Sequence, residues 1–170
     1  GPAVMRKRPG RKPVFTRRQV IDAALAEGIG SFTLRAVAER LGVKATALYR
    51  VFSSRQELQL AAMNAISRDI EPDPRLRTWQ EALRDVVNRY WDMCSRYPEA
   101  ATVILTQPEA FGMALPRIAA IVERLAELGI PAGTDGAAFA LDFVVDMTLE
   151  TYVSIQPYLT PDANGRTGLD

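Results

Sequence analysis

The chain has 170 residues, 48% of them apolar and 24% charged, which is enough to build a folded core and excludes a disordered protein. It has no histidine and one cysteine, Cys94, which excludes an intramolecular disulfide, a Cys/His metal site and histidine-dependent hydrolysis. The net charge of +1 hides a polarity, because residues 1–70 hold 13 Lys and Arg against 5 Asp and Glu, whereas residues 71–170 hold 8 against 15.

This charge polarity is typical of a basic DNA-binding segment followed by a regulatory body that must not bind DNA by itself. The cysteine content indicates a reducing compartment, so we expect a cytoplasmic, nucleoid-associated protein. No apolar run is long enough to predict a membrane span, and no membrane partner is expected.

The first 15 residues are predicted to form a flexible basic arm, in which residues 6–13 combine Lys and Arg with Pro and Gly. Arg11 is a candidate for insertion into the minor groove of DNA, where the negative potential attracts arginine. The alternative is a solvated tail that contacts phosphates without sequence preference. Both interpretations favour nucleic acid as the partner.

Two short helices are predicted after the arm. Thr16 and Gln19 have the spacing of a capping box, and the helix that they begin ends at Gly28. Thr33 is the candidate N-cap of the second helix, which stops at Gly42. Apolar residues recur in both helices at the spacing of one helix face, so both should pack on a common core.

A third helix is predicted over about residues 45–51, directly after the turn at Gly42. Two short helices joined by such a turn form a helix-turn-helix, whose second helix enters the major groove of DNA. Leu48 should face the core, while Tyr49 and Arg50 point outward to phosphates or guanine. The alternative for Tyr49 is a half-buried core position.

A fourth helix is predicted after Ser54, because Ser54 and Glu57 have the spacing of another capping box. This helix completes a predicted DNA-binding domain over residues 16–70.

The sequence over residues 32–52, followed by Arg55 and Leu58, resembles the helix-turn-helix signature of the tetracycline-repressor (TetR) family. The resemblance extends over about residues 15–70, and the turn glycine, the Leu-Tyr pair, the phenylalanine and the basic residue before the fourth helix all fall in step. It implies an all-α fold, with an N-terminal three-helix helix-turn-helix head and a C-terminal helical body for ligand binding and dimerisation. Together with the arm, it gives these candidate DNA-binding residues: Arg11, Thr33, Arg35, Lys44, Ala45, Thr46, Tyr49, Arg50 and Arg55. Two positions depart from the family pattern, since Val51 replaces a frequent histidine and Arg55 a common lysine.

The body is predicted to span residues 71–156. Helical periodicity and the placement of Pro and Gly predict helices over about 76–97, 99–106, 109–128 and 134–155. The third of these is expected to bend or restart near Pro116. Residues 157–170 are expected to form a flexible tail.

By the same resemblance, the body contains a ligand pocket and a dimer interface. The pocket candidates are aromatic or flexible apolar side chains, each with core packing as the alternative: Trp79, Trp91, Met93, Phe111, Met113, Phe139, Phe143 and Met147. The dimer candidates form a second stripe on the last helix: Leu141, Val145, Leu149 and Tyr152. Cys94 is interpreted as a buried apolar residue, with a thiol sensor as the alternative.

We therefore expect a sequence-specific transcriptional repressor that is not an enzyme and needs no cofactor or metal. Its expected partners are double-stranded operator DNA, a second copy of itself in a homodimer, and an unidentified, largely apolar small-molecule effector. One alternative is an architectural, nucleoid-associated DNA binder without an effector, and another is a helical small-molecule carrier or enzyme.

Overall fold

The computed structural model describes Ala3 and residues 14–170, so the predicted arm contact at Arg11 lies outside the described residues. Those residues form helices and no strand, which confirms the all-α prediction. The elements in chain order are α1 (Arg17–Glu27), α2 (Leu34–Leu41), the 3-10 helix η1 (Ala45–Arg50), α3 (Arg55–Ser67), α4 (Trp79–Arg96), α5 (Ala100–Thr106), α6 (Pro108–Glu127) and α7 (Gly133–Leu159).

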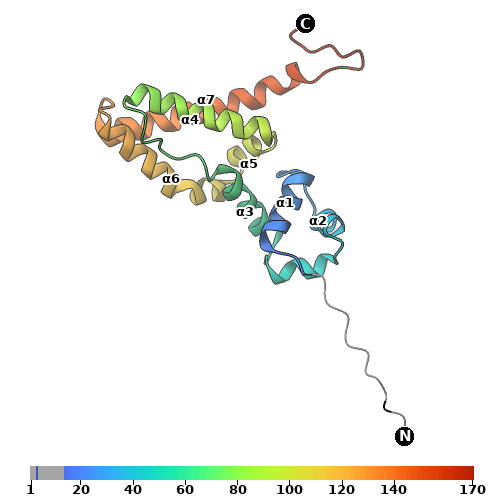
Figure 1. Cartoon of the computed structure of the whole chain (residues 1–170). Coiled ribbons are helices and arrows are strands. Elements are labelled where there is room, and N and C mark those ends of the chain that lie inside the picture. The colour runs from blue at the N-terminus through green and yellow to red at the C-terminus, as the bar shows by residue number, and fades with distance from the viewer. Residues whose placement is uncertain (1–2, 4–13) are drawn as a thin grey trace.

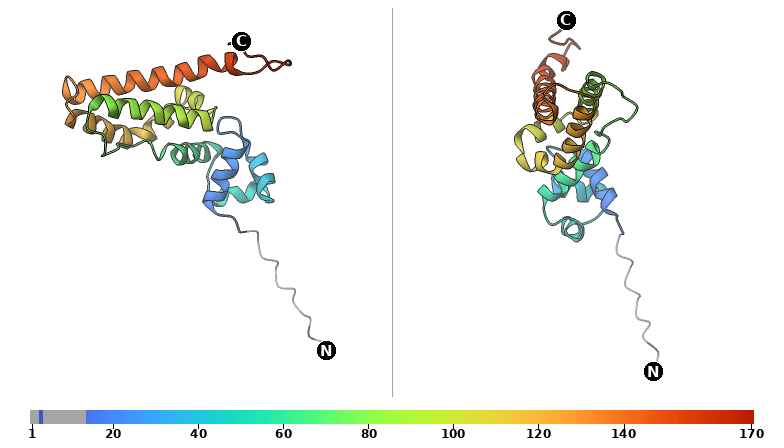
Figure 2. Two further views of the ribbon diagram at one scale, coloured as in Figure 1. Left: turned by 45° about the horizontal axis from the view of Figure 1, so that its top comes forward. Right: turned by 90° about the vertical axis from the view of Figure 1, so that its left-hand side faces the viewer.

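The helices form two groups joined by α3 (Figure 1). We call α1, α2 and η1 the head and α4 to α7 the body. The long α7 packs on α4, α5 and α6, and its C-terminal end projects past the rest of the body (Figure 2). Because α3 packs on α1 at one end and on α6 and α4 at the other, it connects the head mechanically to the body.

One apolar core runs through both groups. It includes Phe32 and Leu48 in the head, Leu58 in α3, and Leu125 and Leu149 in the body, all at most 2% exposed. Burying such side chains contributes about 1.5–3 kcal/mol each. Moving the head relative to the body would therefore disturb core side chains against which both groups pack.

The helix ends follow local capping rules in most places. Thr16 and Gln19 form the predicted reciprocal capping box, and the Thr33 side chain accepts a hydrogen bond from the backbone N–H of Ala36. Gly42 ends α2 in the left-handed region with φ 69°, where a side chain would be strained.

The predicted capping box at α3 is only half correct. Ser54 accepts from the backbone N–H of Glu57, but the Glu57 carboxylate accepts from the backbone N–H and hydroxyl of Ser53. The Ser53 hydroxyl offers the carboxylate a second donor that Ser54, already used as the cap, does not.

Two prolines are accommodated inside helices. The helix α6 continues through Pro116 without a restart, and α7 continues through Pro157 to Leu159, beyond the predicted end near residue 155. Each proline removes one backbone N–H, and both are exposed, so water can satisfy the carbonyl left without a partner.

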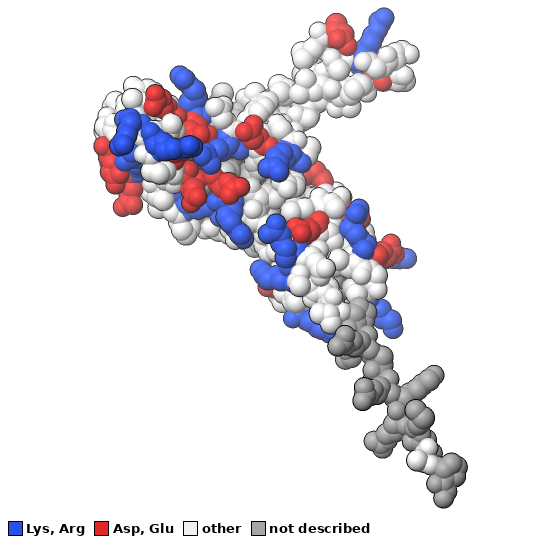
Figure 3. Space-filling model, viewed as in Figure 1, with Lys and Arg blue, Asp and Glu red and all other residues white. Residues whose placement is uncertain are grey.

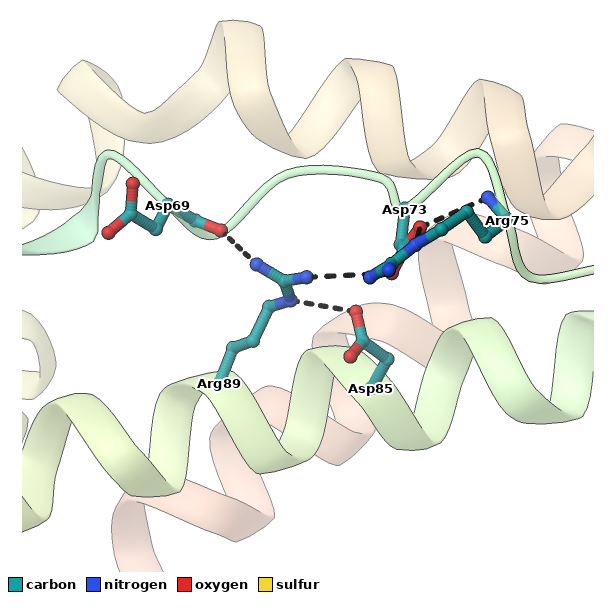
Figure 4. A network of polar contacts seen from close by, with 5 residues as sticks. All are labelled: Asp69, Asp73, Arg75, Asp85 and Arg89. Atoms are coloured by element: carbon teal, nitrogen blue, oxygen red, sulfur yellow. Dashed lines mark hydrogen bonds and ion pairs between the residues drawn. The ribbon is translucent and has the colours of Figure 1, made fainter.

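The loop between α3 and α4 is held by a network of charges (Figure 4). Arg89 of α4 donates to the Asp85 carboxylate at 2.7 Å and to the Asp69 carbonyl at 2.6 Å. Arg75 donates to the Asp73 carboxylate at 2.9 Å, and Arg89 lies 3.9 Å from the same carboxylate. The hydrogen bonds from Arg75 lower the pKa of Asp73 to about 2, so the loop is fixed at neutral pH.

Candidate nucleic-acid interface and apolar cavity

The helix-turn-helix is formed by α2, the turn at Gly42 and η1. The backbone N–H of Val43 donates to the Ala38 carbonyl at 3.0 Å, which fixes the angle at which the chain enters η1. The predicted third helix is present at the expected residues, but it is a 3-10 helix.

The side chains of η1 divide into an inner and an outer set. Leu48 is 1% exposed and anchors the helix to the core, whereas Tyr49 is 57% exposed. The alternative of a half-buried Tyr49 is therefore wrong. Thr46 and Arg50 are also exposed, and Ala45 is partly exposed beside them. This outer face presents hydroxyl and guanidinium groups, which suit contacts to phosphates and base edges.

The start of α2 and the turn add further polar groups. Thr33 and Lys44 are exposed on either side of α2, and Arg35 forms an exposed ion pair with Glu39 at 3.2 Å. In Figure 3, basic side chains lie along the lower edge of the head, whereas acidic and basic side chains are intermixed on the body.

Arg55 differs from the other DNA-contact candidates because it is already engaged within the chain. Its Nε donates to the Phe32 carbonyl at 2.8 Å, an Nη donates to the Gly30 carbonyl at 3.2 Å, and the guanidinium lies 4.2 Å from the centre of the Phe32 ring. These contacts hold the start of α3 against the loop before α2. Phosphate binding by Arg55 remains a prediction for its remaining N–H groups.

The body contains an apolar cavity of about 300 Å³ between α3, α4, α5, α6 and α7. Its lining is mostly apolar and includes Met63, Ile104, Phe111, Met113, Ile121, Leu141 and Val145. The polar lining residues are Ser67, Tyr90 and Asp142. An apolar cavity with a few polar groups is the usual form of a small-molecule site.

Arg117 of α6 contacts Ser67, one of the lining residues of this cavity. It donates to the Asn64 side-chain oxygen at 2.8 Å and to the Ser67 hydroxyl at 2.7 Å, and both acceptors belong to α3. The Ser67 hydroxyl in turn donates to the Met63 carbonyl. Arg117 therefore holds α6 to the end of α3.

The comparison with protein-family models gives a match within the head and α3. The sequence model of the bacterial regulatory proteins of the tetR family matches residues 21–62, which contain the complete helix-turn-helix. The comparison with curated proteins gives no match.

Three solved structures share the fold of the described chain. BioQ with its natural double-stranded DNA operator is 24% identical, with 84% of this chain and 88% of that chain covered and a TM-score of 0.70. A variant of TetR from Acinetobacter baumannii AYE in complex with minocycline is 23% identical, with 84% and 83% covered and a TM-score of 0.67. TetR from the same organism is 26% identical, with 89% and 82% covered and a TM-score of 0.60.

The head therefore matches the tetR family of bacterial regulatory proteins, and the described chain has the fold of the TetR structures. Its head carries the helix-turn-helix of this family, and its helical body has the fold of the neighbours.

The pocket candidates are dispersed in the structure. Phe111 and Met113 line the cavity, whereas Met93 is a core residue. Trp91 packs edge-on against Tyr152, with ring centroids 5.2 Å apart, and Trp79 lies on an outer groove between α4 and α7. Core packing, the alternative, applies to Met93, and Trp79 and Trp91 are partly buried against the core.

The two stripes of α7 have the opposite orientations to those predicted. Phe139 and Phe143 are 75% and 57% exposed and do not line the cavity, and Met147 is 51% exposed on the same outer face. The dimer candidates lie inward instead: Leu141, Leu149 and Tyr152 are buried, and Val145 lines the cavity with Leu141. The inward stripe packs on α4 to α6, because those helices supply the neighbouring core.

Cys94 is fully buried, and burial raises the pKa of its thiol to about 11. This favours the structural interpretation over the thiol sensor. Across Ala3 and residues 14–170, no three His, Cys, Asp or Glu side chains are grouped to hold a metal ion. Nor is any helix in the described part of the chain long and apolar enough to cross a membrane.

Sequence reasoning missed the polar residues that connect the head, α3 and the body. Gln59 is 2% exposed and donates to the Ile29 carbonyl at 2.8 Å, and the Ser31 hydroxyl donates to Glu99 at 2.9 Å. Arg117 had a detectable signal, because it falls on the stripe of α6 that also contains Ile121 and Leu125, both buried. A charged residue at such a position calls for a partner.

Proposed function

We propose that this protein is a TetR-family transcriptional repressor that binds operator DNA as a homodimer and leaves it when a small, largely apolar molecule enters the body cavity. The observation that carries the proposal is the geometry of η1. Leu48 fixes this helix to the core, while Thr46, Tyr49 and Arg50 remain exposed on its outer face. Such a regulator acts without catalysis, in the compartment that holds the DNA.

Each exposed residue of the helix-turn-helix has a role that suits its chemistry. Thr46 and the methyl group of Ala45 are short enough to let η1 approach base edges closely. Tyr49 and Lys44 suit phosphates, and Arg50 can reach a phosphate or guanine. Thr33 and Arg35 start the helix that crosses the DNA backbone in this motif.

The outer face of α7 supports the homodimer. Phe139, Phe143 and Met147 lie one helical turn apart and are all more than half exposed, and the two phenyl rings stack with centroids 6.4 Å apart. A contiguous apolar stripe on a long helix favours association, and a two-fold axis places identical stripes against each other. Two heads related by that axis can then contact successive major grooves.

The cavity favours a ligand-responsive repressor over an architectural DNA binder. It is lined by residues of α3 as well as of the body, so an occupant would contact the helix that carries the head. Among the neighbours, BioQ was solved with operator DNA and the TetR variant with minocycline, so this fold accommodates both kinds of partner.

Selection of bound sequences from a random duplex pool at near-physiological salt tests the proposal. We expect an enriched palindrome with half-sites centred about 34–36 Å apart or a multiple of that distance. Arg50→Ala should relax the selection at one base pair if it contacts guanine, or weaken all binding if it contacts phosphate, whereas Arg96→Ala, an exposed arginine of the body, should do neither. Recovery of unselected DNA would support the architectural alternative, and no recovery would refute DNA binding.

A further inference from the structure

We infer that the effector of the body cavity is a small molecule with an apolar chain and one carboxylate, and that this carboxylate binds at Tyr90 and Arg117. Binding there competes with the hydrogen bonds that hold α6 to α3. The inference rests on the proposed function, because it names the ligand class and the coupling for the same cavity.

The Tyr90 hydroxyl is the first part of the carboxylate site. Tyr90 lines the cavity, is 8% exposed, and has no hydrogen-bond partner for its hydroxyl among the described side chains and backbone groups. Burial raises the pKa of Tyr90, so the hydroxyl keeps its proton at neutral pH and remains a donor. The hydroxyl is not fully buried, so it is free to donate to a ligand oxygen in the cavity that Tyr90 lines.

The Arg117 guanidinium is the second part. It is partly buried, and the two side chains that accept hydrogen bonds from it, Asn64 and Ser67, are both neutral. No carboxylate of the described residues lies within 4.0 Å of it. Arg117 donates to the Ser67 hydroxyl, and Ser67 lines the same cavity as Tyr90, so a ligand carboxylate bound between Ser67 and Tyr90 would lie next to the guanidinium.

A carboxylate would be a stronger acceptor for Arg117 than the Ser67 hydroxyl is. Charge-assisted hydrogen bonds to guanidinium are about twice as strong as neutral ones and are frequently bidentate. Arg117 would therefore exchange Ser67 for the ligand. Because Asn64 and Ser67 lie in the last turn of α3, this exchange loosens the joint between α6 and the helix that carries the head.

Asp142 would favour a ligand of the opposite charge, an amine. It also lines the cavity, from α7, but its side chain is exposed. An amine should bind next to Asp142, whereas a carboxylate should bind at the buried end of the cavity, next to Tyr90. The preference between an acid and an amine of equal chain length therefore distinguishes the two ends.

The size of the cavity determines which small molecule is a suitable test ligand. At about 30 Å³ for each water-sized unit, a volume of about 300 Å³ accommodates about ten non-hydrogen atoms. Octanoate has this size, and octanol and octylamine are its neutral and cationic counterparts.

Calorimetric titration of the full chain with these three compounds near neutral pH tests the site. We expect octanoate to bind about tenfold to a hundredfold more tightly than octanol, and octylamine no more tightly than octanol. Arg117→Gln and Tyr90→Phe should each remove most of the acid preference, whereas Arg84→Gln, an exposed arginine outside the cavity, should retain it. If Arg117→Gln does not fold, Tyr90→Phe and the series on the unchanged protein still decide.

Equal binding of octanoate and octanol, a preference for octylamine, or no binding of octanoate would overturn the inference. The coupling is tested with the selected operator, whose affinity octanoate should lower in the unchanged protein but not in Arg117→Gln. Operator binding without octanoate binding refutes this inference alone. Octanoate binding without operator binding refutes the proposed function and leaves the carboxylate site standing.

Discussion

Glu99, at the start of α5, contacts the loop between α1 and α2. It accepts from the Ser31 hydroxyl and lies close above Gly28 and Gly30. Gly28 has φ +121°, and a Cβ at this position would collide with the Glu99 carboxylate and the Ser31 hydroxyl. The head can approach the body here because a side chain is absent.

Gly28→Ala should therefore lower the free energy of unfolding by about 1–3 kcal/mol, from backbone strain and the collision with Glu99. Gly112→Ala is the matched control, because Gly112 lies in α6 with open space around it, and this change should be neutral or stabilise by up to about 1 kcal/mol. Urea denaturation measures both. Equal effects of the two substitutions would contradict the combined strain and collision assigned to Gly28.

Cys94 should resist alkylation in the folded protein. With the pKa of its thiol raised to about 11, very little thiolate exists near pH 8, and the side chain is fully buried. We expect slow reaction with a thiol reagent in buffer and fast reaction in denaturant. Fast modification of the folded protein, with loss of DNA binding, would favour the thiol sensor instead.

At the scale of elements, the charged loop between α3 and α4 predicts a dependence of stability on pH. The pKa of Asp73 is about 2 in the folded protein, below its ordinary value of about 3.9, because Arg75 hydrogen-bonds to the carboxylate. Because the folded protein holds the Asp73 proton less tightly than the unfolded chain does, the Asp73 charge stabilises the folded state at pH values above the ordinary pKa of about 3.9. This contribution is lost as the pH falls towards about 2.

Asp73→Asn should accordingly lower the Tm at neutral pH, and the difference from the unchanged protein should shrink below about pH 4. Asp22→Asn, in an exposed ion pair on α1, should change the Tm little at any pH. Circular dichroism melts over a pH series measure this. A Tm difference that stays constant down to about pH 2 would show that the Asp73 charge does not stabilise the loop.

Helix positions could be predicted largely because their signals are local. Thr16, Thr33 and Gly42 act through groups within a few residues of themselves. The predicted end of α7 failed at Pro157, because a proline interrupts a helix only when the lost bond and the ring cannot be accommodated. The Glu57 carboxylate also accepts its hydrogen bond from Ser53 and not from Ser54, and the spacing in the sequence does not distinguish these two donors.

The orientation of α7 could not be predicted from its sequence. Periodicity reveals two apolar stripes, but it does not say which one packs on α4 to α6 within the chain. The exposed stripe contains Phe139 and Phe143, whose size favours a pocket or core assignment, and the buried stripe contains Leu141 and Leu149. Which stripe lies inward depends on neighbours that are distant in sequence.

At the scale of the whole molecule, the exposed stripe of α7 predicts the oligomeric state. Phe143→Glu introduces a charge into the centre of this stripe and should weaken dimerisation at least about thirtyfold, as expected for a central aromatic contact. Leu169→Glu, in the exposed tail, should leave the dimer intact. Sedimentation equilibrium measures both, with circular dichroism to check that helix content is unchanged. A Phe143→Glu variant that remains fully dimeric would place the interface elsewhere.

The head and body are coupled at α3 and at Glu99, so the protein should respond as a unit to DNA and to an occupant of the cavity. The measurement that tests sequence-specific DNA binding most directly is the affinity for the selected operator relative to an unrelated duplex of equal length at near-physiological salt. Fluorescence anisotropy should give a ratio on the order of a thousandfold or more, and Arg50→Ala should reduce operator binding by about 1–3 kcal/mol if it contacts guanine. Equal affinities for the two duplexes would contradict sequence-specific regulation by this protein.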